Sequence, residues 1–135
     1  MGLPEVILLD THVAIWLALE PERLSPKAST AIRRARQEEG GLAISAMTLF
    51  ELAQLVACKR VVFDRRLESV LAEVESRLTV LPITAQVALL TTQLPSGYPG
   101  DPMDRIIGAT ALAARLELVT ADERIQLSKA IVTIW

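Results

Sequence analysis

Several kinds of residue that restrict what a protein can do are scarce in this chain. Its single cysteine, Cys58, excludes an internal disulfide and a zinc site built from several thiolates, as is typical of a reducing compartment. The apolar stretches are too short for a membrane-spanning helix, and the first residues lack the basic and apolar segments of a cleavable signal. We therefore expect a cytoplasmic protein with no membrane partner.

The chain also has no large excess of positive or negative charge, because its net charge is only −2. This balance excludes an overall positive field, so any binding of nucleic acid must come from local basic patches or from a bound metal. Aromatic residues make up only 4% of the chain. Trp16 and Phe50 fit core or interface positions better than base-stacking ones, and Cys58 fits a small buried position.

What the chain has in abundance is apolar residues, at 51% with a mean hydropathy of +0.37. A length of 135 residues is typical of one domain, so we expect residues 1–135 to fold as a unit. The apolar excess predicts a partner, which would be a second copy of the chain, another protein, or both.

Short apolar runs alternate with helical segments along the whole chain. Strands are predicted at 5–9, 42–44, 79–81, 118–120 and 131–134. Helices are predicted at 11–19, 26–39, 46–58, 65–77 (capped by Asp64), 85–93, 102–116 and 123–128. This alternation favours an α/β fold with a parallel sheet that has helices on both faces.

Four acidic residues occupy places where such a chain turns from strand to helix, or lie inside a helix. Asp10 and Asp122 follow predicted strands, Asp104 opens a helix, and Glu51 interrupts an apolar helix. Functional sites in open parallel sheets form outside the carboxyl ends of the strands. Carboxylates that converge there repel one another, and a divalent cation relieves the repulsion.

Each acid also has a purely structural interpretation, which the sequence leaves open. Asp10, Asp101 and Asp122 are well placed as helix N-caps, and Asp104 as an acid near the positive end of a helix dipole. Glu51 is harder to explain in this way. Together with Thr48 and Gln54 it forms a narrow polar stripe, spaced by three residues, which we expect to face a cleft.

The basic residues are candidates for contact with phosphate, although each would by default be solvated surface charge. His12, the only histidine, lies two residues after Asp10 and is expected to be a local hydrogen-bonding group. The candidate phosphate contacts are Arg33, Arg34, Lys59, Arg60 and Arg105.

Four segments, in order along the chain, resemble the motifs of PIN-domain proteins. These are residues 8–16 around Asp10, 45–52 around Glu51, 101–105 around Asp104, and 118–122. Each motif is weak alone, but the ordered set spans nearly the whole chain. The compact length resembles the toxin members of toxin–antitoxin pairs, the VapC-like group.

The resemblance implies a five-stranded parallel sheet in the order 3-2-1-4-5. It implies Mg²⁺- or Mn²⁺-dependent cleavage of RNA by a homodimer that a cognate antitoxin inhibits. The metal-binding catalytic acids would be Asp10, Glu51, Asp104 and Asp122. The supporting polar residues would be Thr120, Asp101 and Ser45.

Three other interpretations compete with a nuclease. A haloacid-dehalogenase-like phosphatase would use Asp10 as nucleophile, but His12 stands where its second aspartate is expected. A receiver domain would need a lysine after the last strand, and none follows here. In the third interpretation the acids are only helix caps, and the protein is a non-catalytic interaction module.

Overall fold

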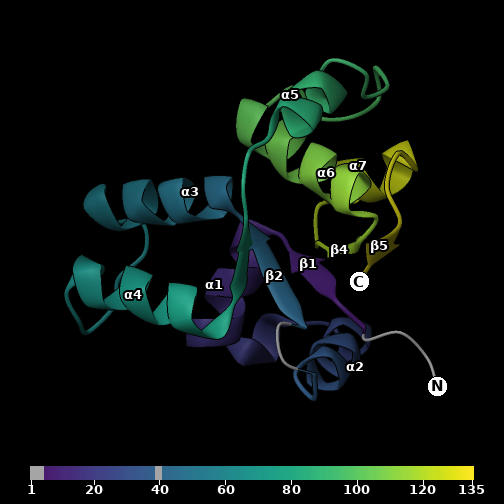
Figure 1. Ribbon diagram of the computed structural model, residues 1–135. Coiled ribbons are helices and arrows are strands. Elements are labelled where there is room, and N and C mark those ends of the chain that lie inside the picture. The colour runs from purple at the N-terminus through teal and green to yellow at the C-terminus, as the bar shows by residue number, and fades with distance from the viewer. Residues whose placement is uncertain (1–4, 39–40) are drawn as a thin grey trace.

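Five short parallel strands form one sheet in the order β3-β2-β1-β4-β5 (Figure 1). The computed structural model describes residues 5–38 and 41–135. The predicted α/β class, parallel pairing and strand order are all confirmed. The strands are β1 (Ile7–Leu9), β2 (Leu42–Ser45), β3 (Thr79–Leu81), β4 (Glu117–Val119) and β5 (Thr133–Ile134).

Helices connect the strands, and one short 3₁₀ helix follows the first helix. No helix among the described residues is long and apolar enough to cross a membrane. The helices are α1 (Thr11–Leu19), η1 (Pro21–Arg23), α2 (Pro26–Ala35), α3 (Ala46–Ala57), α4 (Leu67–Arg77), α5 (Ala85–Thr91), α6 (Pro102–Ala114) and α7 (Glu123–Ser128).

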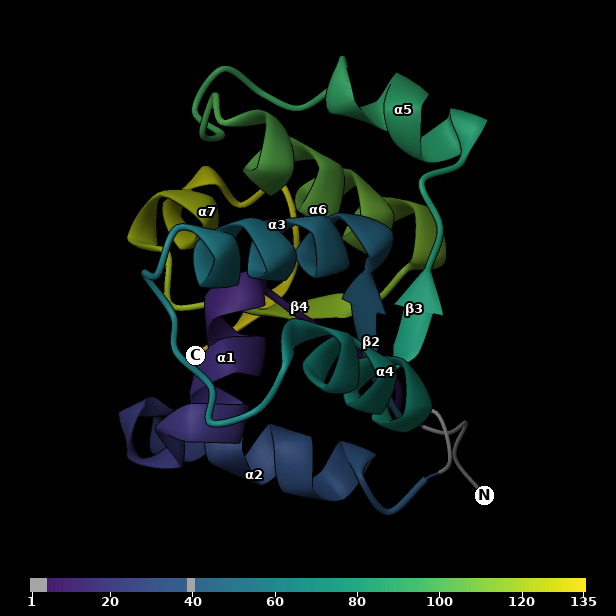
Figure 2. The same cartoon turned by 90° about the vertical axis from the view of Figure 1, so that its left-hand side faces the viewer.

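The sheet separates two hydrophobic cores, because successive side chains of a strand point to opposite faces. Ile7 and Leu9 pack with residues of α1 and α2 on one face. Leu8 packs with residues of α6 and α7 on the other. Figure 2 shows α2 and α6 on opposite sides of the strands. With both faces covered, the central strands β1 and β2 are buried along their whole length rather than at alternate residues.

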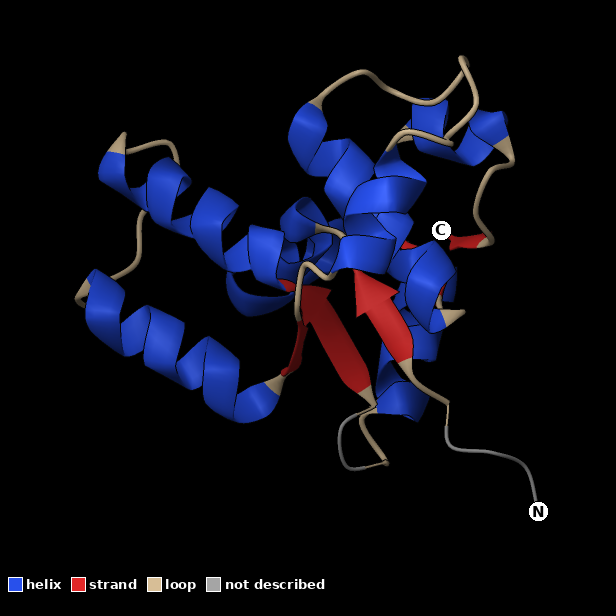
Figure 3. Ribbon diagram, turned by 45° about the horizontal axis from the view of Figure 1, so that its top comes forward, coloured by secondary structure: helices blue, strands red, loops and turns tan. Residues whose placement is uncertain are grey.

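The pair α3 and α4 extends to one side of the sheet, where the two helices lie side by side (Figures 1 and 3). A third, smaller core joins them to α1 through Ile15, Leu52 and Val70. This arrangement carries α3 past the carboxyl end of β2, so that Glu51 stands near the same edge of the sheet as Asp10.

Three local predictions were wrong. Asp64 does not cap α4, which begins at Leu67 after Arg66 without a side-chain cap, because Val61 and Phe63 turn inward to pack on the third core. Helix α2 ends at Ala35, four residues early; the last predicted residue, 39, lies outside the described residues. Cys58 is exposed rather than buried, since it lies just beyond the end of α3.

Candidate functional site

Asp10 stands where β1 ends and α1 begins, and both of its carboxylate oxygens are bound. Oδ1 accepts from the Thr11 amide at 2.9 Å, and Oδ2 accepts from the Thr120 hydroxyl at 2.7 Å. These bonds favour the charged form, but burial outweighs them and raises the pKa of Asp10. The helix-cap interpretation is therefore correct, yet it does not account for a buried carboxylate that is also bound by the residue after β4.

Thr120 follows β4 and connects Asp10 to Asp122. Its hydroxyl donates to Asp10 and accepts from the Asp122 amide at 3.1 Å. Asp122 caps α7 by accepting from the amides of Arg124 and Ile125 at 2.8 and 3.3 Å. Because β1 and β4 are paired in register, the two aspartates leave the sheet at the same edge.

Asp104 lies in the first turn of α6 and is half-buried. Burial, followed by the charges of four other acids, raises its pKa to about 7; those acids are Asp10, Asp101, Asp122 and Glu51. Within the part of the chain that is described, the Asp104 carboxylate has no hydrogen bond or ion pair. Burial and the neighbouring acids therefore oppose the charge of Asp104, and the Arg124 guanidinium is an opposite charge that interacts with it.

Asp101 has the capping role predicted for it, since its carboxylate accepts from the Met103 amide at 2.8 Å. Ser45 likewise caps α3, where its hydroxyl accepts from the Met47 amide at 3.0 Å. Asp101 is exposed, whereas Ser45 is fully buried at the end of β2. Both residues position the helices that carry Asp104 and Glu51, respectively.

The polar stripe on α3 passes from the protein interior to solvent. Thr48 is buried and shares a hydrogen bond of 3.0 Å with the Thr11 hydroxyl, Glu51 is half-buried, and Gln54 is exposed. The Thr11–Thr48 bond joins the start of α1 to α3. It thereby relates the position of Glu51 to that of Asp10.

Two residues near the acids were missed by sequence reasoning. The Tyr98 hydroxyl donates to the main-chain carbonyl of Asp104 at 2.7 Å, and its ring packs where a Cβ on Gly108 would lie 2.2 Å from the hydroxyl. A glycine inside a helix was the signal that a large side chain approaches there. Arg124 contacts the Asp122 carboxylate at 3.3 Å, and this contact raises the pKa of the guanidinium.

The predicted phosphate contacts do not gather at the acids. Arg105 donates to the carbonyls of Pro99 and Thr91 at 3.2 and 3.0 Å, which ties a loop to α6. Arg34 lines a cavity at the amino ends of β1 and β4, the edge opposite the acids. Arg33 neighbours it on α2, and Lys59 and Arg60 follow the far end of α3.

The carboxylates are neighbours, but they do not form a closed cage. Among the described residues, no three His, Cys, Asp or Glu side chains converge closely enough to hold a metal ion as they stand. Their oxygen chemistry nevertheless matches Mg²⁺ and Mn²⁺, which keep several waters and need few direct protein ligands. The donor set therefore fits a hard divalent cation.

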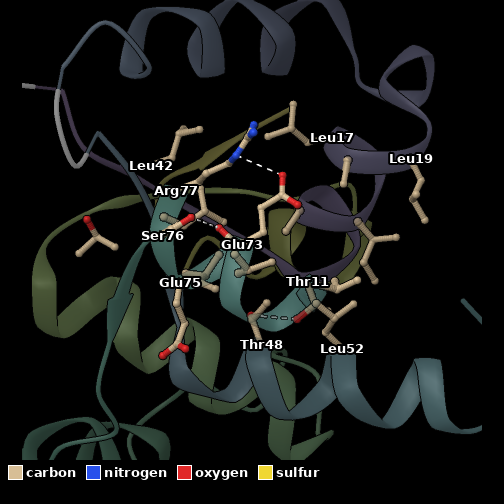
Figure 4. Close-up of a pocket in the computed structure, with 18 of the residues that line it drawn as sticks. Thr11, Leu17, Leu19, Leu42, Thr48, Leu52, Glu73, Glu75, Ser76 and Arg77 are labelled. Carbon is tan, nitrogen blue, oxygen red and sulfur yellow. Dashed lines mark hydrogen bonds and ion pairs between the residues drawn. The ribbon is translucent and has the colours of Figure 1, made fainter. Parts of the chain in front are cut away.

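A large open cavity, of about 1160 Å³, lies between α1, α3 and α4, and its lining includes Thr11 and Thr48 but none of the four candidate acids. Figure 4 shows Thr11 and Thr48 pointing toward one another at one side of it, with Glu73 and Arg77 at another. Its lining is apolar between these polar groups and includes Leu17, Ile44, Leu52, Val70 and Val74.

Comparisons with known proteins agree with this architecture. The family model of the PIN domain matches residues 7–130. The chain is 40% identical to Ribonuclease VapC22 of Mycobacterium tuberculosis over 131 residues, which cover 96% of this chain and 98% of that protein.

Two solved structures extend the comparison. A DNA-bound VapBC complex from Salmonella typhimurium contains a chain with a TM-score of 0.72 and 24% identity, covering 95% of this chain and 96% of that one. A toxin–antitoxin complex from Klebsiella pneumoniae matches with a TM-score of 0.60 and 26% identity over 86% of each chain. The family model and the 40% identity to a ribonuclease favour a nuclease over the phosphatase, the receiver domain and the non-catalytic module. By its sequence and by its fold, this chain belongs to the PIN-domain family.

Proposed function

We propose that this chain, over residues 1–135, is a divalent-metal-dependent endoribonuclease and the toxin of a toxin–antitoxin pair. The observation that carries the metal site is Asp104. Its carboxylate lacks a partner among the described residues, and four other acids surround it closely enough to raise its pKa. Such an arrangement costs stability in the absence of a cation, so it is expected where a cation binds.

PIN-domain nucleases depend on divalent metals, and we propose Mg²⁺ or Mn²⁺ here, held by Asp10, Glu51, Asp104 and Asp122. A bound metal lowers the pKa of a water and neutralises charge on the phosphodiester. The Thr120 hydroxyl and the Thr11 amide each donate to one oxygen of Asp10. The carboxylate is therefore oriented before the metal and the substrate bind. Arg124 stands beside Asp122 and can meet the phosphate charge that the acids alone would repel.

The choice of RNA as substrate follows from the relative named as a ribonuclease. Hydrolysis by water needs no 2′-hydroxyl, so the acids themselves do not select RNA over DNA. An RNA substrate and the single thiol also agree with a cytoplasmic location.

We propose the cavity beside α4 as the place where an antitoxin docks. The support is its apolar lining with a charged rim, together with the toxin–antitoxin complex among the structural matches. A protein segment there would touch Thr11 and Thr48, which adjoin Asp10 and Glu51. Light scattering of the chain alone and with the product of a neighbouring gene would test this partner.

A homodimer is proposed from exposed apolar residues on three helices that pack together. Phe50 on α3, Leu89 on α5 and Leu112 on α6 are all exposed, and α6 contacts both α3 and α5. This surface is separate from the cavity. A chain that remained monomeric in light scattering at micromolar concentration would contradict the proposal.

The deciding experiment is a calorimetric titration with Mn²⁺ of the wild type, Asp104→Asn and Glu73→Gln. Glu73→Gln is the matched control, since it removes an acid outside the site. We expect Mn²⁺ binding and RNA cleavage to be lost in Asp104→Asn and kept in Glu73→Gln. Equal binding by all three proteins, with the fold intact, would return Asp104 to a purely structural role.

A further inference from the structure

Three of the few rings in this chain lie in one row along α1. They are the only histidine and both tryptophans. The ring centroids of His12 and Trp16 are 6.2 Å apart, and those of Trp16 and Trp135 are 5.9 Å apart. His12 and Trp16 are neighbours because they lie four residues apart on α1, whereas Trp135 comes from the far end of the sequence.

Both ends of this aromatic row belong to segments that adjoin Asp10 or its partner Thr120. His12 is in the first turn of α1, two residues after Asp10. Trp135 follows β5, and the Thr120 amide donates to the carbonyl of its neighbour Ile134 at 3.2 Å. Thr120 in turn holds the Asp10 carboxylate. The row therefore borders the carboxylates from a helix and from a strand end at the same edge of the sheet.

Two of the three rings are only partly accessible, and Trp135 also packs against the core that contains Ile7 and Leu9. His12 is exposed, while Trp16 and Trp135 are half-buried. The planes meet at 56° and 51°, so the rings are not stacked face to face on one another. The Arg23 guanidinium lies 4.4 Å from the Trp16 ring centroid. Aromatic faces backed by a guanidinium are the groups on which proteins stack unpaired bases.

We propose that His12, Trp16 and Trp135, with Arg23, form a stacking surface for an unpaired RNA base next to the phosphodiester at the carboxylates. The proposal rests on the proposed ribonuclease function and names the residues that would contact a base of its substrate. Bases within a duplex are already stacked on their neighbours and cannot reach the rings, so the surface takes single-stranded RNA. Stacking on these rings would attract RNA to the carboxylates, where the predicted phosphate contacts do not gather. Trp16 thus has a role that its sequence position did not suggest.

Tryptophan fluorescence reports on this surface directly, because both tryptophans belong to it. The Asp10→Asn variant, which does not consume the RNA, is titrated in Mg²⁺ with a short oligoadenylate and with a duplex RNA of equal length. We expect the single strand to quench the fluorescence and the duplex to have little effect. Adding Trp16→Ala to Asp10→Asn should weaken oligoadenylate binding about tenfold, and adding Trp16→Phe less.

Val62→Ala on the same background is the matched control, since it removes an exposed apolar side chain away from the row. Arg23→Gln leaves the rings in place and should weaken binding by less than Trp16→Ala. This variant also keeps the test valid if Trp16→Ala does not fold.

The outcomes separate the two proposals. RNA that binds without quenching, or with equal affinity to the Trp16 and Arg23 variants, would overturn the stacking surface and leave the ribonuclease intact. Equal quenching by the duplex would also overturn it. Failure of RNA to bind Asp10→Asn, together with failure of the wild type to cleave any RNA, would overturn the proposed function itself.

Discussion

Asp104 and Glu73 are both acids on helices, but they ionise in opposite surroundings. Glu73 on α4 contacts Arg65 and Arg77, and the hydrogen bond from Arg65 is the main reason that its pKa is lowered. Asp104 on α6 is half-buried among other acids, and burial raises its pKa to about 7. The Glu73 carboxylate is paired with arginine, whereas the Asp104 carboxylate lies among other acids.

The difference teaches how this fold separates stability from function. Exposed pairs such as Glu73 with Arg77 add little to stability, since water solvates both ions nearly as well. Asp10 and Asp104, whose pKa values are raised by burial, oppose folding when they are charged, yet the fold brings them together. A group that the fold holds at a cost is a better candidate for function than one that the fold satisfies.

Among the substitutions that test this comparison, removal of the Asp10 carboxylate should have the largest effect. We expect Asp10→Asn to lower the rate of RNA cleavage by at least about 100-fold, because an amide is a poor ligand for a hard cation. Cleavage of a labelled RNA by the purified variant measures this effect, with circular dichroism to verify the fold. Cleavage at the wild-type rate would refute the assigned role.

Asp104→Asn should have opposite effects on stability and on metal response. Without metal at about pH 8, loss of the repelled charge should raise the free energy of unfolding by roughly 1–2 kcal/mol, allowing for solvent screening of a half-exposed group. Urea unfolding with and without Mn²⁺ measures both quantities. A destabilised variant that still responds to Mn²⁺ would contradict this prediction.

The dependence of stability on pH should have the sign that the raised pKa of Asp104 predicts. The raised pKa of Asp104 means that the folded state holds more protons than the unfolded state between about pH 4 and pH 7, so stability falls as pH rises through this range. Mn²⁺ must displace that proton, so the increase in Tm that Mn²⁺ produces should grow from about pH 6 to pH 8. An increase independent of pH would argue against Asp104 as a ligand.

Glu73→Gln should have the smallest effect. Its ion pairs are exposed, so Tm at neutral pH should change by little more than the error of the measurement. RNA cleavage and the response to Mn²⁺ should both be unchanged. A marked loss of cleavage would show that the α4 cluster belongs to the site, and the comparison above would then fail.

Much of the fold could be predicted because local signals and the chain's alternation agreed. The strand order came from the resemblance, since five short apolar runs do not by themselves specify their neighbours. The errors fell where tertiary packing overrode a local signal, as at Asp64, where Phe63 turns toward the third core instead of allowing a cap. Cys58 was misjudged because its residue type favours burial, whereas its place beyond the end of α3 leaves it exposed.

The candidate site was predictable in its residues and not in its energetics. Position after a strand or at a helix start indicated Asp10, Asp122 and Asp104. It did not indicate that Asp104 has a raised pKa, or that Thr120 would connect two aspartates. Those facts depend on distances between segments that lie about 100 residues apart, as the Asp10–Thr120 bond illustrates.

The sequence by itself determined which groups can reach the carboxyl edge of the sheet, because a parallel α/β chain delivers every strand end to one side. Only the tertiary structure decided which acids remain without a partner and which rings border them. The reason is that burial and electrostatic coupling depend on spatial proximity, whereas a pattern of residues records only order along the chain.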